Sequence, residues 1–139
     1  MNKLLFIILT YCFMQSCGKQ ETGYLETINA AYIPDSVVFK AALDPAIPAD
    51  AQRIKFEIPF QSQGIQGIQG TLPISYSIAR IECSNGATDK LGQFGMVGKA
   101  QIKLPFNHTV PAGRYVISVS VRNEDHISVL DSALTVIIR

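Results

Sequence analysis

The sequence Pro111-Ala-Gly-Arg-Tyr-Val-Ile-Ser-Val-Ser-Val-Arg122 alternates between polar and apolar side chains after a proline–glycine turn. Alternation with a period of two residues is typical of a β-strand that buries one face. The register predicts that the apolar side chains face the core. These are Tyr115, Ile117, Val119 and Val121.

Similar patterns recur along the rest of the chain and predict strands at residues 36–43, 53–60, 74–83, 101–104 and 133–138, with a shorter one at 94–97. In residues 53–60, Ile54, Phe56, Ile58 and Phe60 would share the buried face. No window favours a helical period. About seven short strands in about 110 residues predict an all-β fold, an antiparallel β-sandwich or alternatively a closed barrel.

The C-terminal part resembles the last two strands of immunoglobulin-like extracellular modules of the polycystic-kidney-disease, bacterial-Ig and cadherin-like kind. In those modules a Pro/Gly turn and a tyrosine open the penultimate strand, as Pro111, Gly113 and Tyr115 do here. The resemblance implies that the Tyr115 ring lies in the core while its hydroxyl group holds a neighbouring loop. It also implies an immunoglobulin-like β-sandwich over residues 32–139, a fold that specifies little about function.

The N-terminus has the features of a secretion signal. Lys3 precedes an apolar run, residues 4–14, that is too short for a transmembrane helix but suits a signal peptide. The next residues, Met14-Gln15-Ser16-Cys17, resemble the lipobox of bacterial lipoproteins. The resemblance implies that residues 1–16 are removed and that Cys17 carries acyl chains that anchor the protein to a membrane. The alternative is an ordinary secreted protein in which Cys17 lies near the cleavage site by chance.

Residues 17–31 would form a flexible tether, since those just after Cys17 are small, polar and glycine-bearing. Gly18 does not match the aspartate that retains lipoproteins in the inner membrane, so we expect an outer-membrane anchor in the cell envelope. Lipobox, tether and the segment Tyr32-Ile33-Pro34-Asp35 together resemble small lipoproteins encoded alongside starch-utilisation-type glycan uptake systems. That resemblance implies an accessory envelope protein with one or more immunoglobulin-like domains.

Composition argues against several function classes. The chain has 12 Lys and Arg against 11 Asp and Glu, a balance that argues against a nucleic-acid-binding protein. If Cys12 leaves with the signal and Cys17 carries lipid, Cys83 is a lone, inward-packed thiol and no intrachain disulfide forms. His108 and His126 have no second ligand at metal spacing. We therefore expect no enzyme, no metal site and no cofactor.

A glycine-rich segment, Gly64-Ile-Gln-Gly-Ile-Gln-Gly70, is the strongest candidate for a ligand site. Its spacing fits neither a dinucleotide-binding motif nor a P-loop. The simplest interpretation is a loop or bulged edge between strands. The functional alternative is a ligand-facing loop in which the amides of Gln66 and Gln69 bind sugar hydroxyl groups.

Glycan sites usually also present an aromatic ring, and the chain has no tryptophan. Tyr76 and Tyr115 are expected to point inward, which leaves Tyr24 and Tyr32 as candidates for exposed rings. We therefore predict a non-catalytic, lipid-anchored accessory binding module, with Tyr32, Gln66 and Gln69 as candidate ligand-binding residues. A glycan is one candidate ligand, and the sequence leaves the identity of the ligand open. The alternative is a structural or adhesive subunit that joins neighbouring envelope proteins through an exposed sheet edge.

Two short motifs predict covalent modification. Asp35-Ser36-Val37 and Asp131-Ser132-Ala133 both resemble the Asp-Ser/Thr-apolar acceptor of periplasmic O-glycosylation in some Gram-negative lineages. The resemblance implies that Ser36 and Ser132 carry glycans.

Overall fold

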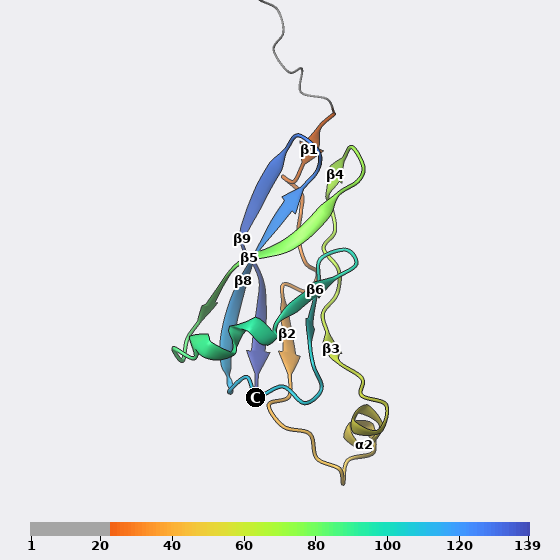
Figure 1. Cartoon of the computed structure of the whole chain (residues 1–139), viewed down its shortest axis with the longest axis vertical. Coiled ribbons are helices and arrows are strands. Elements are labelled where there is room, and N and C mark those ends of the chain that lie inside the picture. The colour runs from red at the N-terminus through yellow and green to blue at the C-terminus, as the bar shows by residue number, and fades with distance from the viewer. Residues whose placement is uncertain (1–22) are drawn as a thin grey trace, which may run out of the picture.

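The computed structural model describes residues 23–139 (Figure 1). The predicted signal peptide and Cys17 lie outside these residues. Within them the chain forms a four-stranded, a three-stranded and a two-stranded sheet. The predicted all-β class is therefore confirmed. None of the helices in residues 23–139 has the length and apolar character needed to cross a membrane.

The largest sheet has the strand order β2-β9-β8-β5. Its strands are β2 (Ser36–Phe39), β5 (Ser75–Cys83), β8 (Gly113–Arg122) and β9 (Ile127–Ile138). Strand β8 pairs antiparallel with both β5 and β9. Strand β2 runs parallel to β9, so the expectation of a wholly antiparallel arrangement is wrong at this edge.

The predicted register of β8 is confirmed, because the side chains of Tyr115, Ile117, Val119 and Val121 have no exposed surface. The Tyr115 hydroxyl group donates a hydrogen bond to the Pro111 carbonyl oxygen at 2.7 Å. This hydroxyl group also accepts one from Asn85 Nδ2 at 2.9 Å. The ring therefore packs in the core while the hydroxyl group holds the turn that precedes the strand.

The smaller sheets complete the fold. The three-stranded sheet has the order β3-β7-β6, and β1 pairs with β4 alone. Their strands are β1 (Leu25–Glu26), β3 (Phe60–Gln61), β4 (Gln69–Gly70), β6 (Gly95–Val97) and β7 (Gln101–Leu104). A 3₁₀-helix, η2 (Thr88–Gln93), lies between β5 and β6. Ile102 and Leu104 of β7 share one hydrophobic core with β8 and β9, so the two larger sheets stabilise each other.

The expected strand at residues 53–60 is wrong over most of its length. Residues Pro48–Lys55 form the helix α2, and only Phe60 enters a strand. Upstream residues start the helix, since Pro48 lies in the first turn and Asp50 is an acid near the helix N-terminus. Phe56, at the helix C-cap, is 62 % exposed, so the alternating apolar residues do not share a buried face.

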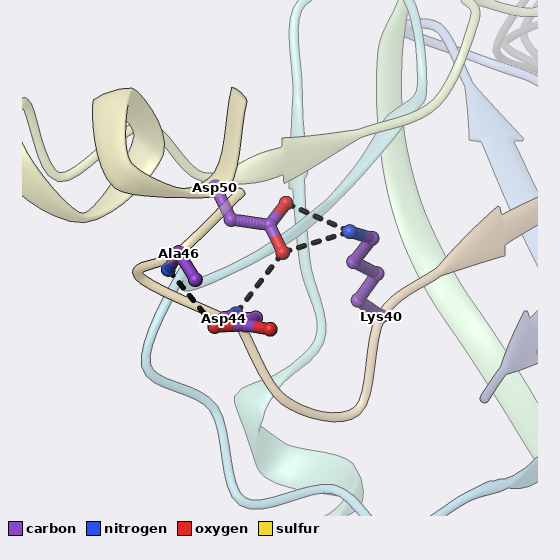
Figure 2. Close-up of polar contacts among 4 residues, drawn as sticks. All are labelled: Lys40, Asp44, Ala46 and Asp50. Carbon is purple, nitrogen blue, oxygen red and sulfur yellow. Dashed lines mark hydrogen bonds and ion pairs between the residues drawn. The ribbon is translucent and has the colours of Figure 1, made fainter. Parts of the chain in front are cut away.

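An ion pair fixes the position of α2 relative to β2 (Figure 2). Lys40 Nζ lies 2.9 and 2.7 Å from the two carboxylate oxygens of Asp50, a buried residue. The Asp44 backbone N–H also donates to Asp50 Oδ2, at 3.0 Å. The hydrogen bonds from Lys40 and Asp44 hold the pKa of Asp50 below its usual value. The loop between β2 and α2 is therefore organised around one buried carboxylate.

The folded domain begins earlier than the predicted boundary at residue 32. Strand β1 pairs Leu25 with Gly70. Ala31 exchanges backbone hydrogen bonds with Gln66 at 3.0 and 2.9 Å. Leu25, Glu26 and Ala31 are thus paired with the glycine-rich segment and a turn joins them, so the prediction that this stretch is a flexible tether is wrong.

Candidate ligand-binding groove

An open cavity of about 900 Å³ lies beside the glycine-rich segment. Three stretches of chain line it. They are residues 64–68, the start of β5 with the segment before it (Leu72, Ile74 and Tyr76), and the turn between β6 and β7 with the first residue of β7 (Gly98, Lys99 and Gln101). Its volume lies within the range of ~300–1,000 Å³ typical of small-molecule sites. We call this feature the glycine-rich groove.

Backbone pairing on two sides holds the wall of the groove. The Ile65 N–H donates to the Lys99 carbonyl oxygen at 2.9 Å, and Gln66 pairs with Ala31. Gly67 has a φ of +77°, and a Cβ atom there would lie 2.0 Å from the Asn29 carbonyl oxygen. Glycine at this position is therefore required by close packing against the N-terminal segment. The wall is a fixed connection between strands, as the simpler interpretation predicts.

Polar side chains surround the groove. Gln66 and Lys99 are exposed, and Gln101 is half-buried. Gln61 Nε2 donates to Gln101 Oε1 at 2.9 Å, so the Gln101 side-chain oxygen is engaged. The Gln101 NH₂ group makes no hydrogen bond to any of residues 23–139 and can donate to a ligand. Within residues 23–139, Lys99 makes no ion pair. Amide and ammonium groups at the rim can thus donate to oxygen atoms of a ligand.

Tyr76 supplies the aromatic surface of the groove. It is half-buried on β5, and partial burial raises the pKa of its hydroxyl group. Its inward direction was predicted, but its place in a cavity was not. Tyr76 lies near the start of β5, which is an edge strand. No further strand lies beside β5 to cover an inward side chain, so the Tyr76 ring faces a cavity.

The prediction that the Tyr32 ring is exposed is wrong, since Tyr32 is only 3 % exposed. Its hydroxyl group donates to the Ala100 carbonyl oxygen. Burial, with a smaller contribution from Tyr76, raises the pKa of Tyr32 to about 12. Pairing of the preceding residue, Ala31, with Gln66 draws this part of the chain onto the core. Tyr32 therefore supports the groove from within the core.

The other predicted residues lie at separate places. Gln69 is exposed on β4 and pairs with Glu26, outside the lining of the groove. Ser36 is exposed at the start of the edge strand β2. Ser132 is exposed in β9 with a φ of +51°. O-glycosylation at both serines stays a prediction. Tyr24 is 56 % exposed, as predicted.

His108 is held by structural hydrogen bonds. Its Nε2 lies 2.9 Å from the Lys40 carbonyl oxygen, and its Nδ1 accepts from the Val110 N–H at 3.2 Å. These partners fit the neutral ring with its proton on Nε2. Over the part of the chain that the structure describes, no group of three or more His, Cys, Asp and Glu residues could hold a metal ion.

Comparison with known proteins gives no relative: the chain matches no family model, no curated protein and no solved structure. Its function is therefore inferred from the glycine-rich groove and from the N-terminal sequence.

Proposed function

We propose that this protein is a non-catalytic lipoprotein of the bacterial outer membrane that binds glycans in the glycine-rich groove. The groove itself carries the proposal. It combines an aromatic ring, Tyr76, with amide and ammonium groups of Gln66, Gln101 and Lys99 around one cavity. An aromatic face can pack against the C–H surface of a sugar ring, while amides bind its hydroxyl groups.

The fold supports an extracellular binding module. Tyr115 at the start of β8 bonds back to the Pro111 carbonyl oxygen, which is the arrangement of a tyrosine corner in immunoglobulin-like domains. Two sheets also share one core. We infer an immunoglobulin-like β-sandwich, modified by the helix α2. Such folds have their binding sites on loops and sheet edges. The glycine-rich groove likewise lies between loops and the edge strand β5.

The anchor is proposed from the lipobox-like sequence that ends at Cys17. Two or three acyl chains on this residue would hold the protein stably in a membrane, whereas a single chain binds only marginally. The first paired strand begins at Leu25, a few residues after Cys17. The domain would therefore be held close to the outer membrane.

Association through a sheet edge has weaker support. Of the two edges of the large sheet, β2 has only 4 residues. The edge strand β5 has an irregular register between Ile78 and Arg80, and Arg80 forms an exposed ion pair with Glu82 at 3.1 Å. Short, bulged and charged edges are features that prevent strand addition.

Two glutamines of the same repeat allow a matched test of glycan binding. The native protein, extracted from membranes in detergent, would be screened on an oligosaccharide array, and the affinity of the best ligand measured by calorimetry. Gln66→Ala should weaken binding about tenfold, since a lost hydrogen bond costs about 1.5 kcal/mol. Gln69→Ala should leave it unchanged. Binding of no glycan, or an equal loss from both variants, would refute the proposal.

The anchor has its own test. The intact mass of the membrane-extracted protein should equal that of a chain starting at Cys17 plus two or three acyl chains. Cys17→Ser should move the protein to the soluble fraction. A soluble, unmodified wild-type chain would instead favour a secreted module. Hexose-sized increments lost in Ser36→Ala or Ser132→Ala would assign the predicted O-glycans.

A further inference from the structure

Exposed apolar side chains gather at the end of the molecule where the described chain begins. Tyr24 is 56 % exposed, Ile28 84 %, Leu72 79 % and Ile127 66 %. Large exposed apolar side chains that lie together on a protein surface mark an interaction surface. We call these four residues the N-terminal apolar cluster; Leu72 belongs both to this cluster and to the lining of the glycine-rich groove.

Hydrogen bonds between three distant segments bring this cluster together. The Tyr24 carbonyl oxygen accepts from the Thr71 N–H at 2.9 Å, next to Leu72, and from Asn123 Nδ2 at 2.8 Å. The hydroxyl groups of Thr27 and Ser128 lie 2.8 Å apart, which places Ile28 near Ile127. The cluster is therefore a fixed feature of one end of the fold.

The short segment between Cys17 and Gly23 limits how far the N-terminal apolar cluster can lie from a membrane. Six peptide units join Cys17 to Gly23, and a chain of that length spans at most about 20 Å when fully extended. An acyl-modified Cys17 thus keeps Gly23, and with it Tyr24, within that distance of the bilayer surface. Helix α2 lies at the opposite end of the long axis (Figure 1).

We propose that the N-terminal apolar cluster lies in the lipid–water interface and sets the orientation of the domain on the membrane. This inference rests on the proposed lipid anchor. Tyrosine suits the interface because its ring is apolar and its hydroxyl group stays hydrated. Isoleucine and leucine side chains add favourable transfer from water into the acyl region.

The charged side chains near the N-terminal apolar cluster indicate which lipid headgroups it would contact. Within residues 23–139, Glu26 and Glu124 are exposed near the cluster, and Arg122 is an exposed cation close to Glu124 in the sequence. There is no polybasic patch among these residues to attract anionic lipid. The surface therefore suits zwitterionic headgroups, such as those of phosphatidylcholine or phosphatidylethanolamine.

Tryptophan reporters test the orientation, because the chain has no tryptophan of its own. The full chain, with its signal sequence, would be expressed in a Gram-negative host, extracted from membranes and reconstituted into phosphatidylcholine vesicles with brominated acyl chains. The tryptophan emission of Ile127→Trp and of Ile28→Trp should be blue-shifted. Bromine should quench most of the intensity of that emission. Phe56→Trp, at the C-terminus of α2, is the matched exposed control and should show neither change.

The outcomes separate this inference from the anchor. If the protein floats with the vesicles but neither reporter is quenched, the cluster does not contact lipid and the anchor stands. A blue shift without quenching would mean that another protein, or a second copy, covers the cluster, which also overturns the inference. Equal quenching of Phe56→Trp would overturn the orientation. Failure to float would refute the anchor and this inference with it.

Discussion

Replacement of Tyr115 by phenylalanine tests whether its hydroxyl group organises the start of β8. The aromatic ring is fully buried and packs against Phe94, with ring centroids 5.4 Å apart. Tyr115→Phe keeps this packing and creates no large cavity. The change removes the hydrogen bond to the Pro111 carbonyl oxygen at 2.7 Å and the one from Asn85 at 2.9 Å.

The expected loss of unfolding free energy depends on which hydrogen bonds Asn85 and Pro111 keep in the variant. Asn85 Nδ2 still donates to the Ala112 carbonyl oxygen at 2.9 Å, so this group stays satisfied. The Pro111 carbonyl oxygen loses its bond to the tyrosine. One net hydrogen bond and part of a second amount to about 1–2 kcal/mol of unfolding free energy. That is well below the ~3–5 kcal/mol expected when a large aromatic side chain is truncated to alanine.

Urea unfolding followed by far-UV circular dichroism measures this loss. The midpoint should fall while the m-value stays the same, because both proteins expose the same surface on unfolding. Tyr76→Phe is the matched control, since no hydrogen bond of the Tyr76 hydroxyl group occurs within residues 23–139, and it should cost less than ~0.5 kcal/mol. Asn85→Ala combined with Tyr115→Phe should be non-additive, since the two side chains are bonded. Equal losses for Tyr115→Phe and Tyr76→Phe would refute the reasoning.

Three further predictions concern pH and backbone packing. Tyr32 has a pKa of about 12 in the folded protein against an ordinary 10.0. The tyrosine hydroxyl group therefore loses its proton in the unfolded state first, and the free energy of unfolding should fall as pH rises between these values. Tyr32→Phe should flatten that part of a profile of stability against pH. The lowered pKa of Asp50 stabilises the fold above its ordinary pKa of 3.8, so acid unfolding should begin as pH falls below that value and be shallower in Asp50→Asn. Gly67→Ala should destabilise far more than Gly86→Ala in urea titrations: both have positive φ, which costs about 1–2 kcal/mol for alanine, but only at Gly67 would the new Cβ meet the Asn29 carbonyl oxygen, at 2.0 Å.

The sequence predicts β8 well because one physical signal dominates there. Tyr115, Ile117, Val119 and Val121 recur at every second position, and each lies in the core. The same signal fails at residues 53–60, where alternation lies across the end of α2. The helix depends on Pro48 and on a carboxylate, Asp50, that binds Lys40, the residue just after β2. A pattern of hydrophobicity contains no information about such a partner.

The parallel pairing of β2 with β9 is also invisible to local patterns. Both segments read as strands, and Val37 and Phe39 point toward the core as alternation predicts. Alternation fixes which face of a strand is buried but not which strand lies beside it or in which direction. The predicted strand at this edge is therefore present, but the expectation that it runs antiparallel to its neighbour is wrong.

The glycine-rich segment shows most clearly where sequence reasoning stops. It contains two identical Gly-Ile-Gln triplets, so Gln66 and Gln69 have the same local chemistry. The structure separates them through pairing: Gln66 bonds to Ala31 and lines the groove, whereas Gln69 pairs with Glu26 and lies outside it. Long-range register, set by a segment about forty positions earlier in the chain, thus distinguishes residues that composition makes equivalent. If Gln66→Ala and Gln69→Ala differ in ligand affinity, that register, and not the presence of amides in a flexible loop, determines binding.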